Sequence, residues 1–185
     1  GRNDPMGVER EAIDSVWLGC NGAIYLTNRV YSPTAYVRVS FPALINETMR
    51  ILYWGIEQLQ YNVYLNSLNS YYSLFIPTNN AMLTYVDPCS YGKPTTQVLQ
   101  FHYDATKVNK DERVWATIRN YDADSMEIGD SVGVIRDNYT IKNRLKDILD
   151  THIVVGNVED GHTYYRTKGG TEIRVSNVSD QQNTT

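Results

Sequence analysis

The sequence predicts an α+β fold, in which helices pack on an antiparallel β-sheet core of sandwich or wedge shape. Three observations predict this class. Two segments carry apolar residues at helical spacing over several turns. Several short segments alternate apolar and polar residues, as half-buried strands do. Most of these strand segments come in pairs joined by polar turns, which is typical of hairpins rather than of parallel βαβ units.

The composition is that of a folded protein and excludes some functions. The chain has 185 residues, 42% hydrophobic and 21% charged, with a net charge of −4. A chain of this length buries enough surface to fold as one domain. Because there is no excess of basic residues, we expect no nucleic-acid partner. No segment approaches the roughly 20 apolar residues of a membrane span, so we expect no membrane insertion by this segment.

The N-terminal part predicts two short strands. Residues 1–15 are charged and aperiodic, so they are predicted to be loose. The turn pair Asn21-Gly22 introduces a strand at residues 23–26. A second alternating segment, residues 37–41, predicts a further strand that Pro42 ends.

A helix is predicted next, over residues 45–63, either continuous or broken in two. Its apolar stripe recurs every three or four residues: Ile45, Met49, Leu52, Ile56, Leu59, Val63. After it, residues 74–76 predict a buried strand that Pro77 ends. Thr78 or Asn79 can then cap a short helix through Tyr85.

The central segment predicts a long hairpin over about residues 97–119, with one face in water. Its inward residues alternate along both strands: Leu99, Phe101, Tyr103, Val114, Ala116, Ile118. Residues 104–112 form its polar connection, and residues 122–130 predict another turn region. A second helix, capped by Asp137 or Asn138, is followed by a strand at residues 153–155.

The last predicted element is a hairpin with Lys168-Gly169-Gly170 as its turn. Cys20 and Cys89 are too few for a disulfide scaffold. They can form one bond, and two buried thiols are an equally good interpretation.

No metal or cofactor site is expected. The three histidines stand far apart in sequence, whereas zinc sites place ligands at short spacing. Residues 122–127 begin like a calcium loop, but Met126 and Glu127 occupy positions that need an oxygen ligand and a glycine, so we interpret them as a solvated acidic turn. A hydrolase using His152 and Asp150 is a further hypothesis, although no nucleophile signature accompanies them.

Trp115 is the best single candidate for a ligand contact. It alternates with the inward residues of its strand, so it is predicted to lie on the exposed face of the sheet. His102 and Tyr103 on the partner strand complete the candidate contact set. The alternative, which we rank first, is that Trp115 only packs on a cross-strand neighbour such as His102 or Gln100.

Two segments together carry a resemblance to a known family. Residues 74–82, Leu-Phe-Ile-Pro-Thr-Asn-Asn-Ala-Met, resemble the first signature of fasciclin domains, and residues 145–156, a helix running into His-Ile-Val-Val-Gly, resemble the second. Residues 171–175 resemble the strand that follows. The signature positions here are Phe75, Pro77, Thr78, Asn79, Ala81, His152, Val154 and Gly156. In the family these two segments are neighbours in the fold, so the resemblance implies that Thr78, Asn79 and His152 act as a polar lock that satisfies buried backbone groups.

The resemblance implies a non-enzymatic adhesion or interaction module, secreted or at the cell surface. It implies a surface protein or polysaccharide as partner, together with neighbouring fasciclin-like repeats and no cofactor. Anchoring to a bacterial outer membrane through a preceding segment is one arrangement that it allows. The family often has Tyr before the signature His, where this chain has Thr151, so integrin binding is not carried over. The alternatives are a carbohydrate-binding module using exposed aromatic residues of the long hairpin, and a plain spacer.

The resemblance also predicts the domain organisation. Residues 21–33 resemble the closing strand of such a domain, and the pattern does not recur near the end of the chain. Residues 1–40 are therefore predicted to be a loose N-terminus and the closing strand of a preceding repeat. Residues 41–185 are predicted to be a fasciclin-like domain without its own closing strand, with the long hairpin inserted. We expect the leading segment, or that of a neighbouring molecule, to fill the vacant sheet position.

Overall fold

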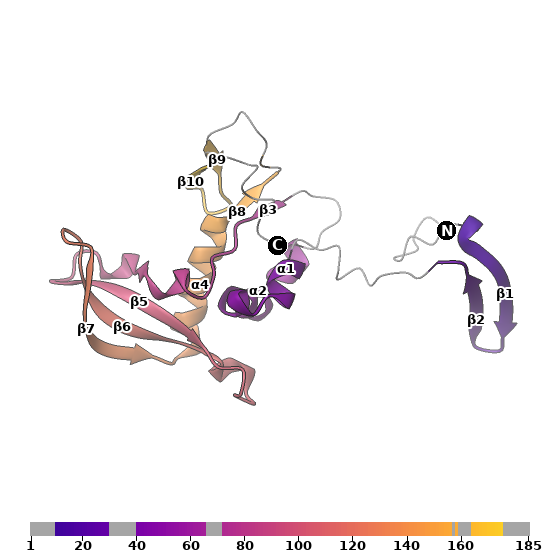
Figure 1. The fold of residues 1–185 in the computed structure, drawn as a ribbon, viewed down its shortest axis with the longest axis horizontal. Helices are drawn as coiled ribbons and strands as arrows, with labels where there is room; N and C mark the ends of the chain where they lie inside the picture. The colour runs from indigo at the N-terminus through magenta and orange to yellow at the C-terminus, as the bar shows by residue number, and fades with distance from the viewer. Residues whose placement is uncertain (1–9, 30–39, 66–71, 157, 159–163, 176–185) are drawn as a thin grey trace.

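The computed structural model describes residues 10–29, 40–65, 72–156, 158 and 164–175. Its fold is α+β, and every pair of strands among these residues is antiparallel, as the sequence predicted. Figure 1 shows a twisted sheet with α4 and α2 on one side of it, and two small strand pairs at one end of α4.

The main sheet has four strands in the order β4-β5-β6-β7. Their bounds are β4 (Tyr85–Val86), β5 (Thr96–Tyr103), β6 (Val114–Asp122) and β7 (Glu127–Ile135). The β5–β6 pair is the predicted hairpin, in regular register from Thr96↔Tyr121 to Tyr103↔Val114. The turn predicted over residues 122–130 is wrong from Glu127 onward, because β7 begins there. Glycines and acidic residues made this exposed edge strand look like a turn.

One face of the sheet forms the core with the helices. The helical elements are α1 (Phe41–Ile45), α2 (Arg50–Gln58), α3 (Tyr61–Leu65) and α4 (Asn138–His152), with short 3₁₀ segments η3 (Glu47–Met49), η4 (Ala81–Leu83), η5 (Pro88–Ser90) and η6 (Lys110–Glu112). Asp137 caps α4 by accepting a hydrogen bond from the Thr140 N–H, at 2.8 Å. Helices α2 and α4 pack closely because Gly55 has no side chain: a Cβ there would lie 3.3 Å from Leu145 Cδ1.

The predicted helix over residues 45–63 is broken more than once. Gln60 adopts a φ of 57°, so the chain turns between α2 and α3. This turn rotates the apolar stripe, so that Val63 is 82% exposed. Ile45, at the other end of the predicted stripe, is the last residue of α1 before the break at Asn46 and is 61% exposed. Tyr61 and Leu65 are buried in their place.

Two small sheets lie beyond the end of α4. In the first, β3 (Tyr72–Leu74) pairs with β8 (Ile153–Val155), into which α4 runs directly. In the second, β9 (Tyr164–Arg166) pairs with β10 (Glu172–Arg174), the predicted terminal hairpin. The strand predicted over residues 74–76 thus ends at Leu74, although the Phe75 N–H still donates to the His152 carbonyl, at 2.9 Å.

The N-terminal segment forms a separate hairpin. After η1 (Arg10–Ala12), β1 (Ile13–Gly19) pairs with β2 (Gly22–Thr27), which confirms the strand predicted at residues 23–26. The prediction that residues 1–15 are loose is wrong for residues 10–15, which belong to η1 and β1, and its first part, residues 1–9, lies outside the described residues. Among the described strands, β2 pairs only with β1, so it does not complete the sheets of its own chain. Of the strand predicted over residues 37–41, the part at 37–39 lies outside the described residues, and Phe41 begins α1.

Candidate functional site

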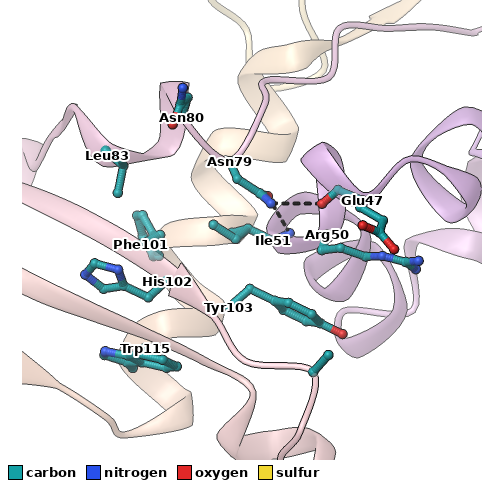
Figure 2. Close-up of a pocket in the computed structure, with 11 residues that line it drawn as sticks. Glu47, Arg50, Ile51, Asn79, Asn80, Leu83, Phe101, His102, Tyr103 and Trp115 are labelled. Atoms are coloured by element: carbon teal, nitrogen blue, oxygen red, sulfur yellow. Dashed lines mark hydrogen bonds between the residues drawn. The ribbon is translucent and has the colours of Figure 1, made fainter.

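A groove of about 790 Å³ lies where β5 ends, between that strand, η4 and the η3–α2 segment (Figure 2). We call it the edge groove. Its lining residues are Glu47, Arg50, Ile51, Asn79, Asn80, Leu83, Phe101, His102, Tyr103, Ala105 and Trp115. The three predicted contact residues, Trp115, His102 and Tyr103, therefore line one groove, and the signature residue Asn79 joins them.

Along this groove, the end of β5 pairs with β6 on one side and with no described strand on the other. The Asp104 N–H donates to the Arg113 carbonyl of the β6 side, at 2.9 Å, so the even-numbered residues of β5 face β6. The N–H and C=O groups of Phe101 and Tyr103 therefore point the opposite way. Strand β4 ends its pairing at Tyr85↔Leu99 and reaches neither residue. Within the described part of the chain, no strand pairs with this stretch of β5, and η4 lies beside it instead.

Asn79 builds the wall opposite β5. Its side-chain Oδ1 accepts the Ile51 N–H at 3.1 Å, and its Nδ2 donates to the Glu47 carbonyl at 3.0 Å (Figure 2). Its own N–H donates to the Thr48 carbonyl. Asn79 thus caps the start of α2 from a distant loop, rather than the following short helix. Thr78 does accept a bond from Ala81 of η4, at 3.3 Å.

We expect Asn79→Ala to lower the free energy of unfolding by about 1–2 kcal/mol, because it removes both side-chain bonds to the first turn of α2. The matched control is Asn80→Ala, whose exposed side chain is expected to contribute less than about 0.5 kcal/mol. Urea titration of both variants measures the difference. Equal stability of the two would contradict this role of Asn79.

Trp115 is held by its neighbours on the outer face of the sheet. His102, directly opposite it on β5, stacks on the indole with ring centroids 5.4 Å apart and planes inclined at 27°. The guanidinium of Arg136, which follows β7, lies 5.5 Å from the indole centroid. His102 Nε2 also lies 3.0 Å from Thr117 Oγ1. The predicted cross-strand packing is confirmed, and the indole is half-buried.

Burial lowers the pKa of His102 below its ordinary value, because it penalises the imidazolium form. The stack on Trp115 is therefore a neutral aromatic pair at neutral pH. The groove combines this apolar wall with a carboxylate, a guanidinium and two carboxamides, from Glu47, Arg50, Asn79 and Asn80. Such a mixture suits binding of a partner with both apolar and hydrogen-bonding groups.

Sequence reasoning missed the helical side of this groove. Glu47, Arg50 and Ala105 lie in exposed or partly exposed positions with no motif around them. The only sequence signal was indirect, because Asn79 belongs to a segment that resembles a family signature. Its long-range bonds across 28 and 32 residues could not be inferred from spacing.

The residues of the hydrolase hypothesis do not form a relay. His152 Nδ1 lies 2.7 Å from the Ile148 carbonyl, which requires this nitrogen to carry the proton and to donate. It therefore cannot accept a proton from Thr151 Oγ1, 3.1 Å away, whose hydroxyl donates to the same carbonyl. These bonds lie within α4, and neither joins His152 to Thr78 or Asn79. Thr78, Asn79 and His152 therefore each make their own hydrogen bonds to the backbone and do not bond to one another, unlike the predicted polar lock.

Asp150 instead lies at the centre of an ionic cluster, in which its own carboxylate is buried and the side chain of Lys146 is 51% exposed. Its carboxylate accepts hydrogen bonds from Lys146 and Lys168, both at 2.6 Å, and from the Tyr61 hydroxyl at 2.5 Å. Burial alone would raise the pKa of Asp150, but these three hydrogen bonds outweigh it and hold the pKa below its ordinary value. The cluster joins α3, α4 and the β9–β10 turn.

The same turn is fixed by the backbone of α4. The Gly169 N–H donates to the Asp150 carbonyl at 2.7 Å. A Cβ at Gly169 would lie 3.2 Å from that carbonyl group, so the close approach needs glycine. Together with the ionic cluster, these contacts give Asp150 a structural role.

The structure also bears on the predictions about metal ligands, cysteines, the acidic turn and membrane spans. Among the described residues, no group of three or more His, Cys, Asp or Glu side chains is placed to hold a metal ion. Cys20 and Cys89 are both exposed and form no disulfide, so the interpretation as buried thiols is wrong. Asp122 accepts backbone bonds from Asp124 and Ser125, as a solvated acidic turn does. None of the helices in the described ranges is both long and apolar enough to cross a membrane.

Comparisons of the chain with protein-family models, with curated proteins and with solved structures gave no match.

Proposed function

We propose that this chain is a non-enzymatic interaction module of fasciclin-like type that holds a protein partner in the edge groove. The observation that carries the proposal is the groove itself. It brings polar side chains of η3, α2 and the Asn79 loop next to the aromatic pair of His102 and Trp115. A peptide held in such a groove gains hydrogen bonds to the polar side chains as well as contacts with the aromatic rings.

Two features support the fasciclin-like part of the proposal. The segments that resemble the two family signatures are direct neighbours, because β3 pairs with β8 and the Phe75 N–H donates to the His152 carbonyl. Gly156, which ends the second segment, has a φ of 115°, a conformation that favours glycine. The family implies a place outside the cell or on its surface, and we propose the same for this chain.

A polysaccharide partner is the second candidate. It is favoured by aromatic rings beside carboxamide and carboxylate groups in one groove. The position of Trp115 weighs against it, because sugars stack on open aromatic faces. Here His102 of β5 and Arg136, which follows β7, lie 5.4 and 5.5 Å from the centroid of the indole.

The test is binding of the purified chain to arrays of cell-surface proteins and glycans and to whole cells. We expect saturable binding to a protein or to cells, reduced at least about tenfold by Trp115→Ala, since buried aromatic anchors dominate such contacts. Ala105→Arg places a long cation in the groove from an exposed loop and should have the same effect without disturbing the sheet.

Tyr139→Ala is the matched control, because it removes an aromatic side chain that is 79% exposed on α4, outside the groove. Circular dichroism verifies the fold of each variant. Glycan binding that depends on Trp115 would show that the partner is a polysaccharide and not a protein. Binding that survives both Trp115→Ala and Ala105→Arg would exclude the edge groove as the site.

A further inference from the structure

We propose that a second pocket of this chain binds a small organic ammonium ion, that is, a protonated primary amine on an apolar body. The pocket has a volume of about 360 Å³ and lies between η4, β4 and the C-terminal end of α4. We call it the α4 pocket. It shares no lining residue with the edge groove, so it is a different site from that of the proposed function.

Most of the wall of the α4 pocket is apolar. Met82 of η4 and Ile148 of α4 line it and are only 3% and 4% exposed. The other apolar residues of the wall are Pro77, Ala81, Val86 and Pro88. Sites for small molecules have such walls with a few polar groups set in them, and their volumes run from about 300 to 1,000 Å³. The small volume of the α4 pocket therefore favours a compact ligand.

The hydrogen-bonding groups of this wall are mostly acceptors. The Thr84 hydroxyl donates to the Ala81 carbonyl at 3.1 Å. The Thr151 hydroxyl donates to the Ile148 carbonyl at 2.8 Å. Each of these hydroxyl oxygens therefore keeps only its capacity to accept. His152 donates from Nδ1 to the Ile148 carbonyl at 2.7 Å, so Nε2 carries the lone pair of the neutral imidazole and accepts as well.

Two polar atoms of the wall are open to a ligand. Within the described part of the chain, His152 Nε2 and the Tyr85 hydroxyl have no hydrogen-bond partner. Neither is one of the buried side-chain atoms that lack a partner, so both can be reached from outside the protein. The Tyr85 ring lies 5.9 Å from that of Phe101, and burial raises the pKa of Tyr85 to about 12. At neutral pH the Tyr85 hydroxyl therefore keeps its proton and can both donate and accept.

The α4 pocket also carries a negative charge. Asp147 lines it and is exposed, and in the described part of the chain its carboxylate forms no ion pair. The guanidinium of Arg144, on the same helix, is held by Asp87 at 2.8 Å. A cation is therefore the ligand that compensates Asp147. An ammonium group brings three N–H donors to a wall of acceptors, and its apolar body matches the rest of the wall.

The first measurement compares three ligands of similar size by NMR titration of the full chain. Phenethylamine carries the ammonium group, phenethyl alcohol replaces it by a hydroxyl, and phenylacetate replaces it by a carboxylate. We expect saturable binding of the amine in the millimolar range or tighter, as a ligand of about ten non-hydrogen atoms can reach. The alcohol should bind more weakly, and phenylacetate should not bind. Equal affinities for the three ligands, or an amine that never saturates, would overturn the proposal.

Asp147→Asn tests the ionic contact, because it removes the charge and keeps the size of an exposed side chain. It should weaken amine binding about fivefold, as expected for a partly exposed ion pair, and leave binding of the alcohol unchanged. Asp124→Asn is the matched control, since Asp124 is an exposed carboxylate in the turn before β7 and does not line the pocket. If the two variants bind the amine equally well, Asp147 does not hold the ammonium group and the assignment is wrong.

Ala81→Leu tests the location. It adds three carbon atoms to an exposed residue of η4 that lines the pocket, so it should abolish amine binding. Ala123→Leu makes the same change at an exposed residue of the β6–β7 turn, outside the pocket, and should bind like the parent chain. Circular dichroism verifies the fold of each variant. Amine binding that survives Ala81→Leu would exclude the α4 pocket as its site.

A lysine side chain of a protein carries the same ammonium group, and N-acetyl-lysine amide is the probe for it. Tighter binding of this probe than of phenethylamine would overturn the assignment to a small free amine.

The proposed function is tested separately. Ala105→Arg obstructs the edge groove and should leave amine binding unchanged, whereas Ala81→Leu should leave binding of a protein partner unchanged. The failure of one proposal therefore does not decide the other.

Discussion

Asp150→Ala is expected to lower the free energy of unfolding by about 3 kcal/mol. The substitution leaves Lys146, Lys168 and the Tyr61 hydroxyl without the carboxylate that they share. Hydrogen bonds to a charged group contribute about 1.5–3 kcal/mol. The buried bond from the Tyr61 hydroxyl accounts for most of the expected loss, because the side chains of Lys146 and Lys168 are 51% and 30% exposed and water solvates them once the carboxylate is removed. Because the cluster joins three parts of the chain, we also expect faster proteolysis at the β9–β10 turn.

Asp147→Ala is the matched control, since Asp147 is an exposed carboxylate on the same helix. It should change stability by less than about 0.5 kcal/mol. Urea unfolding at neutral pH compares the two variants. A loss for Asp150→Ala no larger than that of the control would contradict a structural role for the cluster.

The cluster also predicts how stability depends on pH. The folded-state pKa of Asp150 is lowered, so its contribution is fully present above the ordinary pKa of 3.8 and is lost as the pH falls towards the folded value. Parent and Asp150→Asn should therefore differ by a constant amount from pH 7 down to about pH 5, and the difference should shrink below about pH 4. A stability difference between the two proteins that grows as the pH falls would contradict a lowered pKa of Asp150.

Leu145→Ala is expected to cost about 2–5 kcal/mol, because Leu145 is fully buried between α2 and the rest of the core. The size of the loss depends on how far the neighbouring side chains move into the cavity that the substitution leaves. Loss of this contact loosens α2, whose first turn forms one wall of the edge groove. We therefore expect weaker partner binding as well as a lower unfolding midpoint in urea.

A size exchange tests whether the α2–α4 contact itself carries this effect. Gly55→Leu alone should be strongly destabilising, because the new Cβ would already lie 3.3 Å from Leu145 Cδ1. Combined with Leu145→Ala, the new leucine occupies the vacated space. The double variant should be more stable than the sum of the single losses predicts, by about 1 kcal/mol or more. Strict additivity would show that the two residues do not share one packing site.

Local patterns in the sequence were enough to predict most regular elements. Alternation along residues 97–119 predicted the hairpin, its inward face and the packing of Trp115 on a cross-strand neighbour such as His102 or Gln100, because all three depend on the two-residue period of a strand. The register then placed His102 opposite Trp115. Asp137 predicted the start of α4, because capping is a contact over three residues. Strand β7 was missed because its glycines and acidic residues are tolerated only at a sheet edge.

The candidate site depended on distant contacts. The sequence singled out Trp115, His102 and Tyr103 as candidate contacts, but the opposite wall of the groove comes from Asn79 bonding to Glu47 and Ile51, about thirty residues away. It also could not show that β4 stops after two residues, so that no described strand pairs with the end of β5. Likewise, nothing in the spacing of Asp150 and His152 distinguished a catalytic pair from an ionic cluster, because the partners Tyr61 and Lys168 come from other elements.

By itself, the sequence determined the class of the fold, the strand pairs of the β5–β6 and β9–β10 hairpins and the inward residues of β5 and β6, because these follow from backbone periodicity and contacts within a few residues. Tertiary structure decided where the groove lies, that β1 pairs with β2 and β6 with β7, and what Asp150 does. The groove and the role of Asp150 depend on packing between segments far apart in the chain, where each contact is fixed by shape and burial rather than by any local pattern.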